Sequence, residues 1–478
     1  MYRKNAWHKY DAKQVKEVMK FSEGYKEFLS FGKTERLVVK ESVELLKATG
    51  FKNIEEVKSV KAGDKVYFIN RNKNICAFVI GKEPLNTGLR ILGAHIDSPR
   101  LDLKEHPVYE KGGFAYGDTH YYGGVKKYQY VTIPLALHGV VCKKDGSKVE
   151  VNIGEDPKDP IVGITDLLIH LSADQMAKPM AKAIEGESLD ITLGNMPLNE
   201  KEKNPVKANV LKLLNKKYGI DEEDLISAEI EVVPAGPARD YGLDRSMVAG
   251  YGHDDRVCAY TSLKALLDVD ASQLKNTACC ILVDKEEIGS VGATGAQSLF
   301  FENAIAKLAA LLGLDNPLFA ARITMENSKM LSSDVSAAFD PLYAYVSEPN
   351  NSAYFGEGIV FNKYTGARGK SGSNDANPEY YAFIRKTMDD ANINWQSSEL
   401  GKVDQGGGGT IAYILGNYNM NVIDAGVPVL NMHAPMEIVS KADVYEAYRA
   451  YLAVGFHNKP TISYTPFVYA FSYASKPL

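Results

Sequence analysis

Three apolar, strand-like runs in this chain end in side chains that can bind metal ions or move protons. The runs and the residues that follow them are 89–92 with His95 and Asp97, 278–284 with Glu286 and Glu287, and 422–430 with His433. In open α/β sheets, functional residues collect just beyond the carboxyl ends of the strands. Each ending alone is compatible with an ordinary loop or helix cap, but three of them together predict an α/β sheet with a shared site.

The chain of 478 residues is too long for one ordinary core, so we expect two domains or one domain with an insertion. Helix and strand patterns alternate up to residue 99 and again after 238, whereas residues 100–235 are mostly β-like, with prolines at both ends. We expect a catalytic domain built from residues 1–99 and 236–478, and an inserted β-rich oligomerisation domain, 100–235. The predicted class is α/β, with a mixed sheet and helices on both of its faces.

Hydrophobic periodicity and end signals predict the individual elements. The expected helices are 11–30, 34–49, 209–218, 255–268, 296–313, 379–391, 408–416 and one starting at Ser440. The expected strands are 66–70, 75–80, 89–96, 130–142, 165–171, 226–233, 278–284, 393–400 and 422–430. Thr34 is a predicted N-cap, and Ser440 with Asp443 is a predicted capping box.

Composition excludes several classes of partner. The net charge is -5 and no long basic block is present, so we expect no nucleic-acid binding. The longest apolar run in a helical context, 308–314, is far too short to cross a bilayer, so we expect no membrane insertion. The five cysteines are odd in number and lie in apolar contexts, and the N-terminus has no apolar signal core. These features predict a cytoplasmic protein with reduced cysteines.

Five residues form a coherent set of metal ligands: His95, Asp254, Glu287, Asp334 and His433. Two imidazoles and three carboxylates can hold two zinc ions, each with one histidine and one carboxylate, while the third carboxylate bridges. Co²⁺ or Mn²⁺ could replace zinc in such a nitrogen–oxygen set. Glu286, adjacent to a ligand, is then placed to act as general base.

The motifs at these positions resemble those of the aspartyl aminopeptidase / vacuolar aminopeptidase I family, metallopeptidase family eighteen. They are Ala94-His95-Ile96-Asp97-Ser98-Pro99, Asp284-Lys285-Glu286-Glu287-Ile288-Gly289-Ser290, Ser333-Asp334 and Asn431-Met432-His433. The resemblance implies a zinc exopeptidase with an α/β catalytic domain and an inserted β domain. It also implies that Asp254 bridges two zinc ions per subunit, that Asp97 lies behind His95, and that Glu286 is the base. The family usually has Leu-Asp-Asn where this chain reads His253-Asp254-Asp255, so either aspartate could fill the bridging position.

The resemblance also implies how substrate is bound. The family has a histidine that reaches a neighbouring subunit's active site from an Ile-His-Leu context like that of His170. We place substrate recognition at Lys363, Tyr364 and Gly408, the last within a Gly-rich turn suited to close backbone approach. Because the family's Asn-Gln-Arg-Tyr is replaced here by a sequence around Arg368, the preference stays open between acidic and neutral N-terminal residues.

We therefore expect a metallo-aminopeptidase that acts on peptides with a free N-terminus and forms a homo-oligomer, which the resemblance implies is a tetrahedral dodecamer. The aromatic-rich segment 461–478 is a candidate interface. The alternatives are a deacylase or carboxypeptidase on the same metal core, or a non-catalytic assembly or cargo protein. The Gly-rich stretch 289–295 matches neither nucleotide fingerprint, and two glutamates beside it would repel phosphate.

Overall fold

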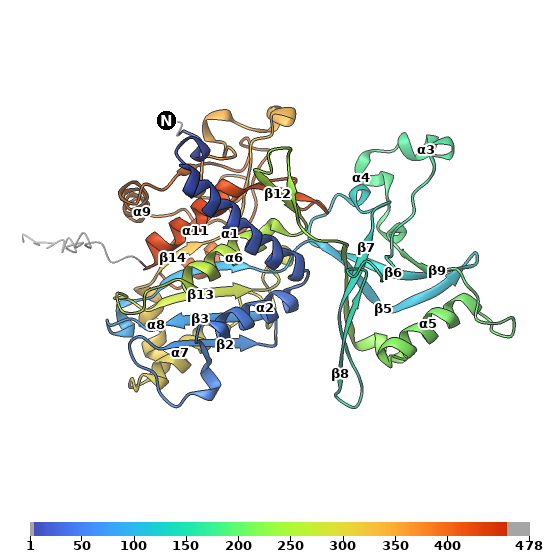
Figure 1. Ribbon diagram of the computed structural model, residues 1–478, viewed down its shortest axis with the longest axis horizontal. Helices are drawn as coiled ribbons and strands as arrows, with labels where there is room; N and C mark the ends of the chain where they lie inside the picture. Colours follow the sequence, from blue (N-terminus) through green and yellow to red (C-terminus); the bar gives the residue numbers. More distant parts are fainter. Residues whose placement is uncertain (1–3, 457–478) are drawn as a thin grey trace, which may run out of the picture.

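The computed structural model describes residues 4–456 of the chain, which form two lobes (Figure 1). Within these residues the strands form three sheets of nine, six and five strands. The left lobe in Figure 1 contains the nine-stranded sheet and both ends of the described chain, and the right lobe contains the six-stranded sheet.

The nine-stranded sheet is mixed, and its central strands are parallel. Its strands in spatial order are β1 (Lys52–Asn53), β2 (Lys65–Asn70), β3 (Asn74–Val79), β13 (Ala278–Val283), β4 (Arg90–His95), β14 (Lys329–Ser332), β18 (Asn421–Gly426), β16 (Ile359–Asn362) and β17 (Trp395–Ser397). β13, β4, β14 and β18 run parallel to one another, while β3 and β16 pair antiparallel at the two sides of this group. The carboxyl ends of the parallel strands therefore share one edge, as the endings of the apolar runs predict.

Both faces of this sheet are buried under helices. Alternate residues of β13 contribute to different cores: Cys280 and Leu282 belong to one cluster, and Cys279 and Ile281 to the other. The helices that contribute to the first core are α1 (Ala12–Phe31), α2 (Glu35–Ala48), α6 (His253–Leu267), α9 (Pro378–Asp390) and α11 (Lys441–Phe456). Those that contribute to the second are α7 (Phe300–Leu311), α8 (Pro317–Glu326) and α10 (Ala412–Gly416). This arrangement confirms the predicted α/β class.

All strands of the six-stranded sheet come from residues 100–234. In spatial order they are β8 (Lys148–Ile153), β7 (Leu135–Cys142), β10 (Ala228–Pro234), β5 (Arg100–Lys111), β6 (Phe114–Tyr122) and β9 (Ile191–Gly194). Every pair of neighbouring strands is antiparallel, so the strands can be joined by hairpins and need no crossover helices. The sheet packs around its own core, accompanied by α3 (Ala173–Met176), α4 (Met180–Ala183) and α5 (Pro205–Tyr218).

The third sheet gathers the loops that carry chemistry. Its strands in spatial order are β11 (Arg239–Tyr241), β12 (Met247–Gly250), β20 (Glu437–Ser440), β19 (Pro428–Leu430) and β15 (Ser336–Ala337). β12 leads into Asp254, β19 leads into His433, and β15 begins two residues after Asp334. This small sheet therefore brings together three candidate ligands that are far apart in the sequence.

Four of the predicted strands differ in the structure: β7 begins only at Leu135, β17 covers only Trp395–Ser397, and the other two are not single strands. Residues 165–171 are irregular and end in a short 3₁₀ helix, Ile169–Leu171, because their apolar side chains are exposed and face no second layer. Residues 422–430 form two strands in two sheets, since β18 ends at Gly426, where a Cβ atom would lie 1.8 Å from the Asp334 carbonyl oxygen. Only glycine, which has no Cβ atom, fits at this close approach.

Several helix predictions also need correction. The predicted helix 296–313 covers only α7, and α8, which begins at Pro317 behind an Asn316 cap, was not predicted. Thr34 caps α2 as predicted. Asp443 does not serve a capping box, because its carboxylate accepts the backbone N–H groups of Gly356 and Gly358 at 2.8 and 2.7 Å. The predicted interface segment 461–478 lies outside the described residues. No helix in residues 4–456 is long and apolar enough to cross a membrane.

Candidate active site

The carboxyl edge of the nine-stranded sheet collects the predicted site residues from separate elements. His95 ends β4, Glu286 and Glu287 follow β13, Asp334 follows β14, Asp254 is the second residue of α6, and His433 follows β19. The two glutamates lie in a 3₁₀ turn, Glu286–Ile288, whose flanking residues Lys285 and Gly289 both have left-handed backbone conformations. This tight turn directs both carboxylates to the cavity described below.

Asp254 lies between the two histidines. Its Oδ1 is 3.1 Å from Nε2 of His95, and its Oδ2 is 3.3 Å from Nε2 of His433. Asp255, the alternative for this position, instead accepts the backbone N–H of His95 at 3.3 Å and is completely buried. Asp254 is therefore the aspartate whose two oxygens face both histidines.

Each histidine has a second carboxylate nearby. Asp334 Oδ1 is 4.0 Å from Nε2 of His95, and Glu287 Oε2 is 3.5 Å from Nε2 of His433. Two ligand atoms of one tetrahedral zinc ion lie about 3.3 Å apart, because each is about 2.0–2.2 Å from the metal. The spacing therefore suits zinc, and the ligand atoms of His95, Asp254 and Glu287, and those of His95, Asp255 and Asp334, lie within 4.8 Å of one another.

The charges of this cluster also call for cations. Burial and the neighbouring charge of Asp254 raise the pKa of Glu287 well above its usual range, and burial and the charge of Asp255 do the same to the pKa of Asp334. Oε1 of Glu287 is buried without a hydrogen-bond partner among the described residues. Buried carboxylates in such proximity are stable only when protons or cations neutralise them. The residues present therefore fit a metal centre.

Two further acids hold the backbone of the ligands. Asp97, completely buried, accepts the backbone N–H groups of Glu286 and Glu287, each at 3.1 Å, and its Oδ1 is 3.3 Å from Nδ1 of His95. Glu437 accepts the backbone N–H groups of Asp254 at 3.0 Å and His433 at 2.7 Å. Glu437 is not among the predicted site residues, and its only local signal is an acid four residues after His433, at the start of a strand.

A cavity of about 450 Å³ opens in front of these ligands. Glu286 lines it, with Oε2 3.9 Å from Nε2 of His95, and burial raises the pKa of Glu286 to about 7. Gly408 also lines it, within a turn where Gly406 and Gly407 pass too close to other backbone atoms for a side chain to fit. The remaining lining side chains of the described chain are neutral: Ser290, Val335, Ser336, Asn362, Thr365, Leu400, Thr410, Tyr413 and Met432.

Three predicted site residues do not line this cavity. Lys363 forms an ion pair with Asp375, and Tyr364 donates a hydrogen bond to Glu399. His170 lies exposed in the six-stranded lobe. The structure thus brings together the five ligand candidates with Asp97, Glu286 and Gly408. Within one chain, Lys363, Tyr364 and His170 lie away from this group.

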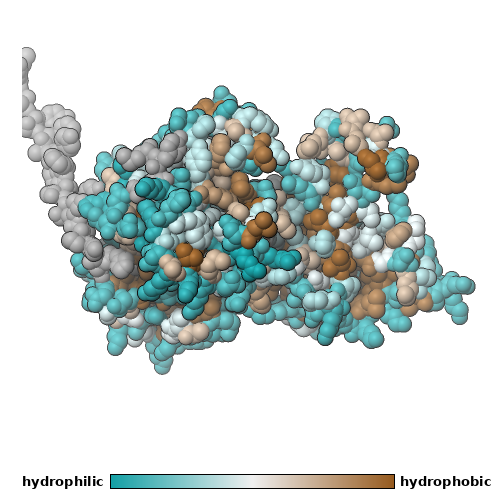
Figure 2. Space-filling model, turned by 45° about the horizontal axis from the view of Figure 1, so that its top comes forward, coloured by the Kyte–Doolittle hydropathy of each residue, from teal (hydrophilic) through white to brown (hydrophobic). Residues whose placement is uncertain are grey.

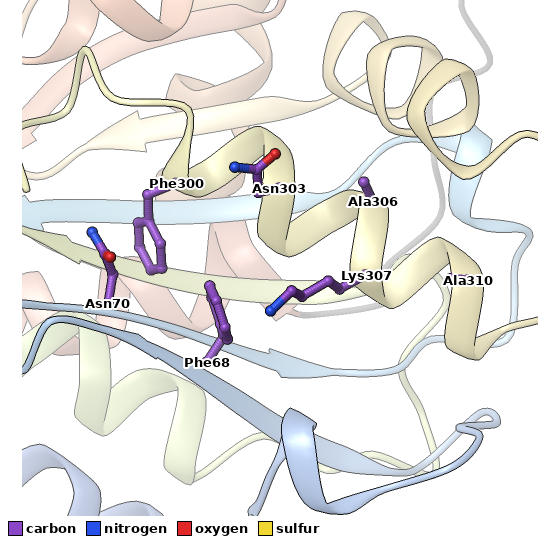
Figure 3. A pocket seen from close by; sticks show the side chains of 7 residues that line it. All are labelled: Phe68, Asn70, Phe300, Asn303, Ala306, Lys307 and Ala310. Atoms are coloured by element: carbon purple, nitrogen blue, oxygen red, sulfur yellow. The ribbon is translucent and has the colours of Figure 1, made fainter. Parts of the chain in front are cut away.

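A second hollow lies between β2 and α7, on the other side of the sheet from α1 and α6. Figure 3 shows Phe68 and Phe300 at its centre, with ring centroids 5.4 Å apart, and Lys307 extended toward Phe68. Lys307 is the only titratable residue of its lining within the described chain, and it also pairs with Glu55. This hollow has no group for hydrolysis, so the chemistry belongs to the cavity beside His95.

Comparison with known proteins finds relatives that match nearly the whole chain. A sequence model of the aminopeptidase I zinc metalloprotease (M18) family matches residues 28–454. A probable M18 family aminopeptidase 1 of Clostridium acetobutylicum is 58% identical over 455 residues, which are 94% of this chain and 97% of that protein. The crystal structure of an M18 aminopeptidase from Thermotoga maritima matches with a TM-score of 0.92 and 44% identity, covering 95% of this chain and 99% of that chain. The S. cerevisiae mApe1 dodecamer shares the fold, with a TM-score of 0.72 and 20% identity over 91% of this chain and 95% of that chain.

Proposed function

The chain belongs to the aminopeptidase I zinc metalloprotease (M18) family, and from this premise we propose that it removes N-terminal residues from peptides with a dinuclear metal site and a glutamate general base. The family match also confirms the resemblance seen in the sequence motifs. The observation that carries the dinuclear proposal is the position of Asp254, whose two oxygens face two different histidines.

Two zinc ions would be held by separate donor sets. His95 and Asp334 would bind one, His433 and Glu287 the other, and Asp254 would bridge them. When bound, such ions polarise the scissile carbonyl and lower the pKa of water. Imidazole and carboxylate donors suit zinc, and Co²⁺ or Mn²⁺ could replace it.

The protein's own residues move the proton. Glu286 lines the cavity and is absent from the proposed ligand sets, so its carboxylate is free to accept a proton from the attacking water. Burial raises the pKa of Glu286 above its usual range, which suits both this step and the return of the proton to the leaving amine. Asp97 keeps the carboxylate in place through the backbone N–H of Glu286.

We propose that the preferred N-terminal side chain is neutral. The cavity lining within the described chain contains no lysine or arginine, and its remaining walls include Leu400, Tyr413 and Met432. Lys363 and Lys370 are both engaged by Asp375 outside it. An acidic side chain would be desolvated there without a cationic side chain to pair with, which costs free energy.

A panel of peptides tests both activity and preference. Leucyl, aspartyl and lysyl peptides of otherwise identical sequence are assayed with a free and with an acetylated N-terminus. We expect hydrolysis only of free amines, with kcat/KM at least about 10-fold higher for leucyl than for aspartyl peptides, a difference of about 1.4 kcal/mol. Cleavage of the acetylated peptides would instead favour the deacylase or carboxypeptidase, and an aspartyl preference would contradict the neutral pocket.

We further propose that the chain forms a homo-oligomer through the inserted domain. Figure 2 shows apolar side chains, in brown, gathered on the right-hand lobe. Around His170, the side chains of Ile169 and Leu171 are 66% and 70% exposed, and Met176 and Met180 nearby are similarly exposed. Exposed apolar patches of this kind mark interaction surfaces. The dodecamer of the distantly related yeast protein is compatible with a dodecamer here.

In such an oligomer His170 would reach the cavity of a neighbouring subunit and donate a hydrogen bond to the developing oxyanion. Loss of such a donor typically costs about 100- to 1,000-fold in kcat. The test mixes two variants that are each nearly inactive, His170→Phe and Glu286→Gln, by dissociation and reassembly. Mixed particles should regain activity, because some sites then combine both intact residues. Reassembly of each variant alone is the control, and inactive mixed particles would contradict action between subunits.

A further inference from the structure

The end of strand β6 reaches the active site of its own chain. Tyr122, its last residue, donates a hydrogen bond from its hydroxyl to Oδ2 of Asp97 at 2.9 Å. Asp97 is the completely buried acid that holds His95 and the backbone of Glu286 and Glu287. Within the described residues, Tyr122 is the only hydrogen-bond partner of Asp97 that comes from the six-stranded lobe. The six-stranded lobe contributes no candidate metal ligand within this chain. Through Tyr122 it nevertheless contacts Asp97, the residue that holds the candidate ligand His95.

The tyrosine ring is itself held in place. Arg100 is paired with Tyr122 across β5 and β6, and its guanidinium carbon lies 3.9 Å from the ring centroid. Arg100 is buried and forms ion pairs with Asp102 at 2.8 Å and Glu231 at 3.1 Å. A cation stacked on the ring and fixed by two carboxylates restricts the ring's rotation. The hydroxyl is thus presented to Asp97 in a fixed direction.

The two residues after Tyr122 contact the other half of the site. The carbonyl oxygen of Gly124 accepts a hydrogen bond from Nδ1 of His433 at 2.8 Å, which leaves Nε2 free for a metal ion. A Cβ atom at Gly123 would lie 3.3 Å from Cβ of Glu287, and its backbone has a left-handed φ of +72°. The segment 122–124 therefore lies against the residues of both proposed ions.

We propose that Tyr122 is a positioning residue of the metal centre, and that the segment 122–124 makes the six-stranded lobe a fixed part of the active site in the same chain. The hydroxyl holds the side chain of Asp97, whose backbone carbonyl and carboxylate lie 3.0 and 3.3 Å from Nδ1 of His95 and orient its imidazole. The Gly124 carbonyl orients the imidazole of His433. Groups behind metal-bound histidines set ring orientation, and their loss typically costs about 10- to 100-fold in metal affinity or activity. This proposal rests on the proposed dinuclear site. It adds that residues 122–124 of the six-stranded lobe hold the histidine ligands of that site in place.

The test compares Tyr122→Phe with Tyr130→Phe in the full-length protein. Tyr130 is a matched control, because it is completely buried in the same lobe and donates one hydrogen bond, to the carbonyl of Pro99 at 3.0 Å. Metal-free protein is titrated with Co²⁺ against a competing chelator, and the visible absorption of the bound cobalt is recorded. We expect Tyr122→Phe to weaken one of the two Co²⁺ sites by about 10- to 100-fold and to change its absorption spectrum. Tyr130→Phe should match the wild type in both.

Two further outcomes separate this proposal from the proposed function. A wild-type protein that binds two Co²⁺ ions, together with a Tyr122→Phe variant of unchanged affinity and spectrum, would overturn the positioning role and leave the dinuclear site intact. Equal weakening in Tyr122→Phe and Tyr130→Phe would also overturn it, because a general loss of packing would then explain both. A wild-type protein that binds fewer than two ions would contradict the proposed function itself.

Discussion

Glu286→Gln is expected to lower kcat by about 100- to 10,000-fold while the protein retains both metal ions. The amide has the shape of the carboxylate but cannot accept the proton of the attacking water. Its position in the turn after β13 does not change, since Asp97 holds the backbone N–H groups of Glu286 and Glu287. Activity on a leucyl peptide and metal content of the same preparation, measured by mass spectrometry, check both parts of this expectation.

The matched control is Glu326→Gln. Glu326 is an exposed glutamate on α8 that does not line the cavity, so this variant should retain full activity. Two results would contradict the base assignment. One is a Glu286→Gln enzyme with nearly normal kcat. The other is loss of a metal ion together with activity, because Glu286 would then act as a ligand.

Asp254→Asn is expected to weaken both metal sites at once and to lower kcat/KM by at least about 1,000-fold. Its two oxygens face His95 and His433 separately, so one substitution affects both donor sets. A neutral amide is a poor ligand for a divalent ion, and loss of Lewis-acid stabilisation costs several kcal/mol, where about 1.4 kcal/mol corresponds to tenfold. The measurement is metal content after dialysis, together with kcat/KM.

The matched comparison is Asp255→Asn, one residue further along the chain. Asp255 accepts the backbone N–H of His95, and no ion pair joins it to His433. This variant should keep the ion held by His433 and Glu287. If Asp255→Asn loses both ions while Asp254→Asn keeps them, the bridging position belongs to Asp255.

The parts of the site that were predictable are those carried by strand ends. β4 and β13 are apolar on both faces, because they lie in the middle of a sheet covered by helices. β4 ends in His95, and β13 is followed by Glu286 and Glu287. A buried strand followed by a polar residue can be recognised from the amino-acid sequence alone. The same alternation of apolar runs predicts the α/β class, although the expected strands include neither β14 nor β16 of this sheet.

The parts that were missed depend on contacts between distant segments. Glu437 binds the backbone of Asp254, 183 residues earlier, and no local pattern encodes such a pairing. Lys363 had the right charge for an acidic substrate, yet Asp375, twelve residues later, neutralises it outside the cavity. The apolar composition of residues 165–171 predicts a strand. No strand forms there because these side chains are exposed, and composition alone does not reveal this. Tertiary packing thus determines what periodicity alone cannot.

The number of zinc ions bound per subunit is the measurement that tests the dinuclear site most directly. Metal-free protein is titrated with zinc, and ions bound and hydrolysis of a free-amine leucyl peptide are followed in the same samples. With Asp254 shared by two donor sets, binding should saturate at two ions per subunit, and activity should require both. Saturation at one ion, with full activity at that point, would contradict the account.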